Sequence, residues 1–382
     1  MKQVHYDVVI CGGGVAGVSA AVAAARQGAK TVLIEKQCLL GGLATSGLIY
    51  IYLPLCDGKM KQVTFGIAEE MLKRCVEYGP FAVPEQWGGS KGGDPGCREA
   101  TVLNRYACCF SPAGFTLTLD KMLAEAGVDL WLDTMIIGAD TGGRRVTAVE
   151  VANMSGILKV AGKTFVDATG ASLVARFAGA KVISEMNYVT PWILEMASDP
   201  SSYHFTESLH VRSFGKHTPK YAMEPEFDGR KVTEFVRRGW KLMRTYYDRF
   251  GREERVRNYP VHLPAMPQIR KIAYIDAVRI LHDEDAYKEV EHCIGMGADW
   301  VKSAAPGWPV PFESLVPKAL DNLLAAGRCI GAGGYAWEIL RVIPNAAMTG
   351  EAAGLAAFLC GRSGIASKDL PFEELEKLLP KS

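Results

Sequence analysis

An α/β fold with a parallel sheet is predicted by two features of this 382-residue sequence. The N-terminal residues 6–36 contain an apolar run, a glycine turn, an Ala-rich helical run and a second apolar run. Apolar runs followed by helical runs recur near residues 164–180 and 323–360. Parallel strands need helical connections, so this alternation favours an α/β protein. The length allows two or three domains.

The first element is the run YDVVIC, residues 6–11, which is typical of a buried parallel strand. Gly12, Gly14 and Gly17 follow with the G-x-G-x-x-G spacing, and an Ala-rich helix ends at Gly28. The second strand, TVLIE, ends at Glu35. This Rossmann-like arrangement places a helix N-terminus against a pyrophosphate and a carboxylate against a ribose diol.

The next element is a loop of small residues, Gly41, Gly42, Ala44 and Thr45. In a simple NAD domain the chain usually returns through a short helix at this point. A Gly-Gly-x-Ala-Thr loop instead suits a backbone that passes close to a long, flat cofactor. An ordinary glycine-rich surface loop is the alternative interpretation.

Two later segments extend the pattern. A strand in TFVDATG ends at Asp167 and precedes a helix, and NLLAAGRCI, residues 322–330, predicts a further strand that enters a glycine-rich turn. Residues 343–360 read as a helix with a small-residue face. Its N-terminus beside Ile343 and Pro344 would direct the helix dipole at an anionic ring or carbonyl.

Charge and composition exclude some classes of protein. The formal net charge is +1 without a long basic or acidic block, which argues against nucleic acid or an anionic membrane as the main partner. No apolar run approaches the roughly 18 to 20 residues that cross a bilayer, and the N-terminus lacks a signal-peptide pattern. We therefore expect a cytoplasmic protein with no membrane span.

The ten cysteines show no C-x-x-C spacing, so we expect reduced structural thiols. His204, His210 and His217 are too irregularly spaced for a metal site, and no metal is expected.

The chain resembles the FAD-dependent oxidoreductase family, with the flavin domain of the glutathione reductase and fumarate reductase flavoproteins. The motifs that carry the resemblance are the G-x-G-x-x-G turn with Glu35, GGLATSG, VDATG, MPQIRKIAYIDA and LVPKALDNLLAAGRC…RVIPNAAMTGEAAG. The resemblance implies a discontinuous FAD-binding domain at residues 1–75, 112–187 and 311–382. An inserted α+β substrate or cap region would comprise residues 76–111 and 188–310.

The resemblance also implies a set of FAD-binding residues. They are Gly12, Gly14, Gly17, Glu35, Lys36, Gly41, Gly42, Ala44, Thr45, Met135, Ile136, Ala168, Thr169, Gly170, Gly327, Arg328, Arg341, Val342 and Ile343. Asp167 would close the adenine side, and Pro344 would approach the flavin ring.

The chain departs from this family at one place. Relatives commonly carry a histidine between the GRC strand and the Arg-Val pair, but here the segment is GAGGYAWEIL with Tyr335, Trp337 and Glu338. A second G-x-G-x-x-G is absent, so no separate NAD(P)H domain of that type is expected. Electrons would enter from a small-molecule substrate or from an electron-donor or electron-acceptor protein.

Flavin chemistry requires few protein groups beyond a proton carrier and a cation. We expect Arg270 and Arg341 to hold an anionic substrate or the flavin anion, with a structural salt bridge as the alternative for Arg270. His262 is a candidate acid or base, or a surface residue. Tyr335 is a candidate proton donor, or a packing residue. Glu338 is a weaker candidate base.

The sequence therefore predicts an FAD-dependent oxidoreductase that transfers a hydride between bound flavin and a small organic substrate, at an alcohol, an amine or a C–C or C=C bond. Two alternatives stay open: a flavin electron-transfer subunit that acts with a partner protein, and a non-catalytic flavin-binding protein.

Overall fold

The computed structural model describes residues 3–59, 61–83, 107–188, 191–198, 203–204, 209–214, 222–223, 228–302 and 305–381. Most of the glycine- and proline-rich segment 81–100 lies outside the described residues, as does His217.

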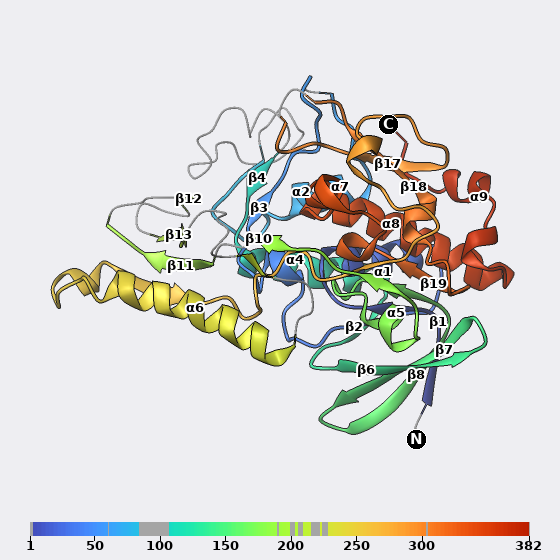
Figure 1. Ribbon diagram of the computed structural model, residues 1–382, viewed down its shortest axis with the longest axis horizontal. Coiled ribbons are helices and arrows are strands. Elements are labelled where there is room, and N and C mark those ends of the chain that lie inside the picture. The colour runs from blue at the N-terminus through green and yellow to red at the C-terminus, as the bar shows by residue number, and fades with distance from the viewer. Residues whose placement is uncertain are drawn as a thin grey trace.

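A central sheet of seven strands organises the molecule (Figure 1). The strands are β1 (Gln3–Cys11), β2 (Thr31–Ile34), β5 (Asp129–Trp131), β6 (Met135–Gly142), β7 (Arg145–Asn153), β8 (Gly156–Asp167) and β19 (Leu323–Ala325). The order is β5-β2-β1-β8-β7-β6, and β19 also pairs with β8. Strands β5, β2, β1, β8 and β19 are parallel, whereas β6 and β7 extend the sheet in antiparallel fashion. The predicted parallel sheet is confirmed.

Strand β1 is apolar on both sides because both faces of the sheet are covered. Val8 and Ile10 belong to the core shared with α1 (Val15–Arg26) and α8 (Ile343–Ser363). Val9 and Cys11 point the other way, into a second core with α5 (Leu173–Phe177) and β7. Alternating side chains of one strand thus serve two cores, which explains the unbroken apolar run at the start of the sequence.

Helices α1 and α8 pack at unusually close range through small residues. A Cβ added at Gly350 would lie 2.2 Å from the carbonyl oxygen of Ala16, and one at Gly354 would lie 2.2 Å from that of Ala20. This contact explains the small-residue face predicted for residues 343–360. Among the described residues, no single helix has the length and apolar composition to cross a bilayer; α8 meets that test only together with α7 (Gly334–Leu340), at a bend of 87°.

The remaining elements of the main body are short. They are α2 (Ile67–Arg74), α4 (Pro112–Ala126), α9 (Phe372–Glu376) and the two-stranded sheets β3 (Ile51–Tyr52) with β4 (Cys108–Cys109), β9 (Val182–Ile183) with β16 (Tyr274–Ile275), and β17 (Cys293–Gly297) with β18 (Trp308–Pro311). Eight cysteines of the described residues are free, but Cys109 is disulfide-bonded, contrary to the expectation of reduced thiols throughout.

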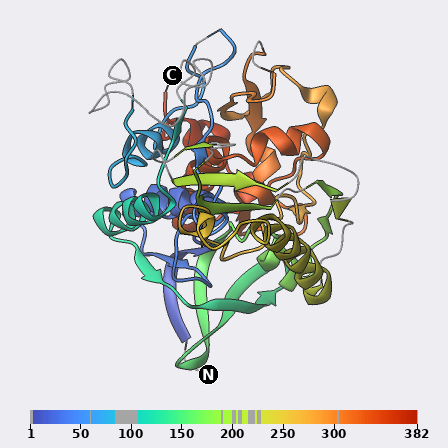
Figure 2. The ribbon, with the colours of Figure 1, turned by 90° about the vertical axis from the view of Figure 1, so that its left-hand side faces the viewer.

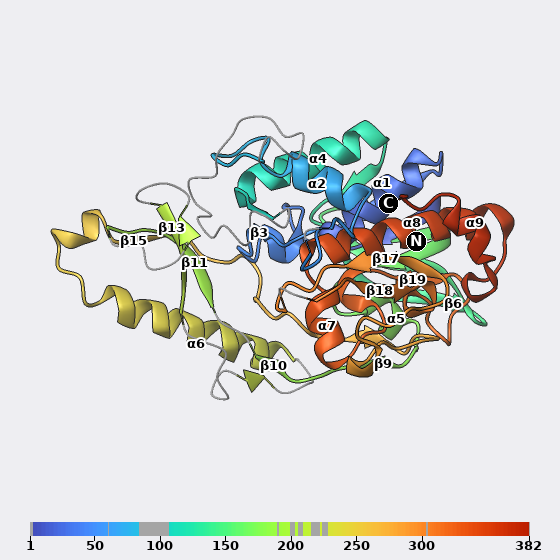
Figure 3. The ribbon, with the colours of Figure 1, turned by 90° about the horizontal axis from the view of Figure 1, so that it is seen from above.

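A separate substructure projects from one side of the body (Figures 1 and 3). Its sheet has the order β12 (Tyr203–His204), β13 (Leu209–Ser213), β11 (Trp192–Met196) and β15 (Tyr259–His262). The long helix α6 (Gly229–Tyr247) lies along it, and β10 (Asn187–Tyr188) pairs with β14 (Ala222–Met223) at its base. We call the described part of residues 191–263 the arm; in Figure 2 it faces the viewer. The arm thus combines a sheet with a long helix, and the division of the chain at residues 76–111 and 188–310 stays a prediction.

Candidate functional site

The turn after β1 is shaped by contacts that only glycine tolerates. Gly12 has a φ of 104°, and an added Cβ would lie 2.6 Å from the carbonyl oxygen of Ala168. A Cβ at Gly17 would lie 1.8 Å from the carbonyl oxygen of Gly12. Around Gly14, by contrast, the space for a Cβ is open, with no atom of the described residues within 4 Å. The turn is therefore closed towards the protein and open on the side where a phosphate would approach.

Two helix N-termini meet near this turn. Gly14 at the start of α1 and Val342 at the start of α8 provide no side-chain cap. The first helical hydrogen bonds are donated by the amides of Val18 and Ala346, so the amides before them have no partner within their helices. Gly327 lies between the two helices, where an added Cβ would lie 2.8 Å from Ala16 Cβ and 3.6 Å from Ala346 Cβ. Uncapped N-termini of this kind attract anionic groups.

The loop predicted to pass along the cofactor does run beside the glycine turn. Gly41 donates its amide to the carbonyl oxygen of Gly13 at 2.8 Å and forms an isolated parallel bridge with Gly14. Thr45 donates its hydroxyl to the carbonyl oxygen of Leu40, which fixes the turn. The hydroxyl of Ser46 is fully buried and has no hydrogen-bond partner among the described residues. An orphaned buried hydroxyl in this loop fits a cofactor that supplies the missing partner.

Glu35 is held in place for a ligand by backbone amides. Its carboxylate accepts hydrogen bonds from the amides of Gly13 at 2.6 Å and Gln37 at 2.9 Å. Burial raises its pKa, while these hydrogen bonds and the charge of exposed Lys36 oppose the rise. Because a carboxylate has about four acceptor positions, Glu35 keeps acceptor capacity for a ribose hydroxyl.

The residue before β6 is hydrogen-bonded to Glu35. The amide of Thr134 donates to the carbonyl oxygen of Glu35 at 3.0 Å, which brings Met135 and Ile136 next to the ribose position. Strand β5 precedes β6 here, and the two are separated by a turn in which Asp133 has a φ of 47°. The Met135 side chain is 53% exposed, so it is available to a bound adenine.

Asp167 organises the turn after β8. Its carboxylate accepts hydrogen bonds from the Thr169 hydroxyl at 2.7 Å and from the amides of Thr169 and Ala175. Burial raises its pKa, against the effect of these donors. The guanidinium of Arg328 lies against Gly170, where an added Cβ would be 2.2 Å from Nη2. These contacts join the predicted VDATG and GRC motifs at one place.

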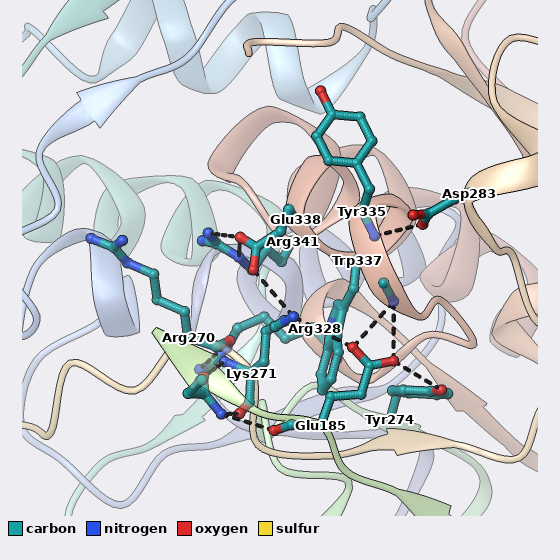
Figure 4. A network of polar contacts seen from close by, with 12 residues as sticks. Glu185, Arg270, Lys271, Tyr274, Asp283, Arg328, Tyr335, Trp337, Glu338 and Arg341 are labelled. Atoms are coloured by element: carbon teal, nitrogen blue, oxygen red, sulfur yellow. Dashed lines mark hydrogen bonds and ion pairs between the residues drawn. The ribbon is translucent and has the colours of Figure 1, made fainter. Parts of the chain in front are cut away.

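A chain of alternating charges connects α7 to the segment before β16 (Figure 4). Arg341 donates to the carboxylate of Glu338 through Nε, at 3.0 Å, and through Nη2. The Nζ of Lys271 lies 3.3 Å from Oε1 of Glu338 and 3.4 Å from Oε2 of Glu185. Glu185 also accepts a hydrogen bond from the backbone amide of Gly334, at the start of α7. Burial raises the pKa of Glu338, but the positive charges of Arg341 and Lys271 together lower it by more, so the pKa lies below its ordinary value. The Arg341 charge is therefore neutralised within the protein.

Arg270 differs from its neighbours because it forms no ion pair with a carboxylate of the described residues. The side chain turns away from Lys271 and Glu185 (Figure 4). Its buried Nε has no hydrogen-bond partner among the described residues, and its guanidinium lies 5.6 Å from the centre of the Trp192 ring. Burial and the charge of Arg341 lower its pKa to about 10. A desolvated guanidinium with an unused donor is suited to an anion.

Comparisons with known proteins identify the family. Residues 7–190 and 273–379 match the family model described as FAD dependent oxidoreductase. The chain belongs to this family, and its cofactor is FAD. The match does not distinguish the glutathione reductase or fumarate reductase type of flavin domain, which stays a prediction.

Two curated relatives and one solved structure are similar to this oxidoreductase. The digeranylgeranylglycerophospholipid reductase of Picrophilus torridus is 28% identical over 189 residues, and that of Thermoplasma volcanium is 26% identical over 186 residues. Each match covers 47% of this chain and 43% of the relative, so less than half of either relative is matched. A geranylgeranyl bacteriochlorophyll reductase-like protein of Thermoplasma acidophilum has a TM-score of 0.52 at 16% identity, over 98% of this chain and 82% of that one. This last likeness shows the fold.

Two candidate acid–base residues lie outside the charged network of the oxidoreductase. The hydroxyl of Tyr335 donates to the buried carboxylate of Asp299 at 2.9 Å, and Tyr287 donates to the same carboxylate at 2.6 Å. Burial and Asp299 raise the pKa of Tyr335, so its proton is held firmly. His262 lies exposed on β15 of the arm.

Lys271, Glu185 and Ser46 are site residues that the sequence prediction did not include. Lys271 directly follows Arg270 in QIRKIAY, and the pair of consecutive cations was the available signal. Lys271 points towards carboxylates, whereas Arg270 points away from them. Glu185 had no signal, because its partners are 86 and 149 residues away in sequence.

Proposed function

We propose that this oxidoreductase uses its FAD to reduce a C=C bond in an unsaturated isoprenoid that carries an anionic head group. Arg270 is the observation that carries the proposal, because its guanidinium is desolvated and retains an unused donor. The names of the curated relatives, digeranylgeranylglycerophospholipid reductases, support an isoprenoid chain attached to a phosphate. The bound FAD supplies the two-electron chemistry, and the chain's residues position the substrate.

The charged network gives each residue a separate task in this proposal. Arg270 binds the anionic head group and so fixes the position of the chain behind it. Arg341 and Glu338 form a neutral pair that orients the junction between α7 and α8. The N-terminus of α8, which is the positive end of its helix dipole, begins at this junction. Lys271 and Glu185 connect the Arg270 segment to α7. We do not assign the proton donor to Tyr335, since its hydroxyl is used by Asp299.

The experiment follows re-oxidation of the flavin. The holoenzyme is reduced without oxygen, mixed with geranylgeranyl phosphate or with the neutral alcohol geranylgeraniol, and followed by visible absorption. We expect the phosphate to re-oxidise the flavin and to gain two hydrogens by mass spectrometry, and the alcohol to react more slowly at equal concentration. With enzyme whose flavin has not been reduced, we expect neither compound to gain hydrogen at a C=C bond, because no electrons are available.

Two outcomes contradict the proposal. If an alcohol or amine reduces the oxidised flavin, the reaction runs in the opposite direction at a different bond. If no small molecule exchanges electrons with the flavin but an electron-transfer protein does, the chain is an electron-transfer subunit.

A further inference from the structure

Positive charge is concentrated in the second half of the arm. Residues 228–263 contain ten Lys and Arg and five Asp and Glu, a net charge of +5 with histidine neutral, whereas the whole chain carries +1. The remainder of the chain is therefore at −4. Helix α6 alone has six basic residues and a single acidic one, Glu234. The low net charge of the chain thus conceals a strongly basic region.

Helix α6 presents these charges on one face. Gly239 and Met243 are buried on the inner face of α6, and an added Cβ at Gly239 would lie 3.3 Å from the Pro191 side chain. The opposite face is exposed and carries Arg230, Arg237, Arg238, Lys241 and Arg244. Lys241 lies three or four residues from each of the other three at positions 237, 238 and 244, and Arg230 lies seven residues, about two helical turns, before Arg237. Within the described part of the chain, the one ion pair on this face is a long contact of 3.9 Å between Arg238 Nη1 and Glu234 Oε1, both exposed. Exposed pairs of this kind are weak, so the face keeps its positive potential.

Large apolar side chains are also exposed in the second half of the arm. They are Trp240 on the border of the basic face of α6, Val256 after the helix, and Tyr259, Val261 and Leu263 on and after β15. Val256 is 71% exposed and the other four are 40–46% exposed. Figure 3 shows that α6 and β15 both lie in the projecting arm and that the chain between them forms its far end, away from the sheet of the main body.

We propose that the arm docks on a lipid bilayer with anionic headgroups. Arginine and lysine side chains on a helix attract such a surface, and neighbouring tryptophan, tyrosine and aliphatic side chains enter the headgroup region. A nucleic acid would use the basic face but would gain little from the exposed aliphatic residues. The family match skips residues 191–272, so the arm lies outside the matched flavin domain. The proposal concerns docking and does not depend on the reaction proposed above.

The test measures binding of the FAD-loaded protein to vesicles by flotation, without turnover. We compare neutral phosphatidylcholine vesicles with vesicles that contain about 30% phosphatidylserine, at low salt and at about 0.5 M salt. The test variant is R237E/K241E/R244E. The matched control, R176E/K181E/K288E, makes the same change in charge at exposed positions of the main body. Retained flavin absorption verifies that each variant is folded.

We expect the wild-type protein to bind the anionic vesicles and not the neutral ones, and high salt to weaken binding. The test variant should bind at least about tenfold more weakly, because three attractive charges become repulsive. The control should bind within about twofold of wild type. A V256S/L263S variant should lose binding that remains at high salt. Equal loss in the control, equal binding to neutral vesicles, or binding to DNA or RNA without binding to vesicles would overturn the proposal.

Discussion

Arg270 and Arg341 carry the same charge and lie close enough for one to lower the pKa of the other, yet the structure gives them different environments. Arg341 is paired with Glu338, whereas the buried Nε of Arg270 has no partner among the described residues. Removing a paired side chain exposes its partner, while removing an unpaired one mainly removes a binding site. This difference makes the two arginines distinguishable by experiment.

We predict that Arg270→Ala raises the KM for a phosphate-bearing substrate by about ten- to a hundredfold, since a charge-assisted hydrogen bond of about 1.5–3 kcal/mol is lost. The FAD content should stay unchanged. Steady-state kinetics with the phosphate and with the neutral alcohol provides the measurement. An equal loss for both substrates would show that Arg270 acts on structure rather than on the anion.

We predict that Tyr335→Phe leaves kcat within about threefold of wild type but lowers the free energy of unfolding by about 1–2 kcal/mol. The hydroxyl donates to buried Asp299, and its loss leaves that carboxylate with one donor fewer. Activity assays and urea titration give the two numbers. A loss of kcat by a factor of a hundred or more would restore Tyr335 as the proton donor.

Glu351 supplies a prediction about pH. It accepts the amide of Ile67 at 2.8 Å, and burial raises its pKa to about 7 from an ordinary 4.5. Between these values the folded protein binds a proton that the unfolded chain has released, so stability should fall as the pH rises from about 4.5 to 7. Glu351→Gln should remove this cost and raise the Tm at pH 8 more than at pH 5. The exposed Glu376→Gln variant is the control, and an equal effect of both variants would contradict the prediction.

The contact between α1 and α8 depends on small side chains. Their backbones approach closely because the facing residues are glycine and alanine, and this closeness brings the two uncapped N-termini to the same side of the sheet. Packing and cofactor binding therefore depend on the same small side chains.

We predict that Gly350→Ala weakens FAD binding and lowers the free energy of unfolding by about 1–3 kcal/mol, because its Cβ meets the Ala16 carbonyl oxygen at 2.2 Å. Gly361→Ala on the same helix is the matched control. Its Cβ finds ordinary van der Waals space, with the nearest atom at 3.4 Å, and alanine favours the helix, so this change should stabilise by up to about 1 kcal/mol. Fluorescence titration with FAD and thermal unfolding measure both effects. Similar results for the two variants would disprove the packing argument.

The predicted flavin site would join segments from the whole length of the chain: the turn after β1, the loop at residues 41–46, the turn after β8 and the N-terminus of α8. A ligand that contacts all of them binds the folded chain and not the unfolded one. FAD should therefore stabilise the whole main body, not one element.

We predict that FAD at about one hundred times its Kd stabilises the apoprotein by about 2.7 kcal/mol, whereas NAD at the same concentration has a smaller effect. Differential scanning calorimetry of FAD-depleted protein provides the measurement. Equal stabilisation by both nucleotides would mean that the adenosine part alone is recognised.

Local sequence patterns determined the parts of the fold and site that depend on neighbours in the chain. The glycine turn, Glu35, the small-residue loop and the helix at residues 343–360 were predictable, because the spacing of glycines and the run of apolar residues follow from backbone geometry within one βα unit. The parallel direction of the strands in the sheet was predictable from the same alternation of apolar and helical runs. The division of the segment around Met135 into two strands did not, since a turn at Asp133 has no glycine or proline to mark it.

The tertiary structure alone decided which charges are neutralised. The sequence shows Arg270 and Lys271 as equivalent neighbours, but Lys271 forms ion pairs with Glu185 and Glu338 while Arg270 pairs with neither. These carboxylates lie 86 and 67 residues away from Lys271 in the sequence, so only the folded chain shows which of the two cations they contact. It also decided that the basic residues of α6 share an exposed face while the net charge of the chain stays at +1. Long-range pairing and burial set the electrostatic free energy of a side chain, and neither is encoded in its immediate neighbours.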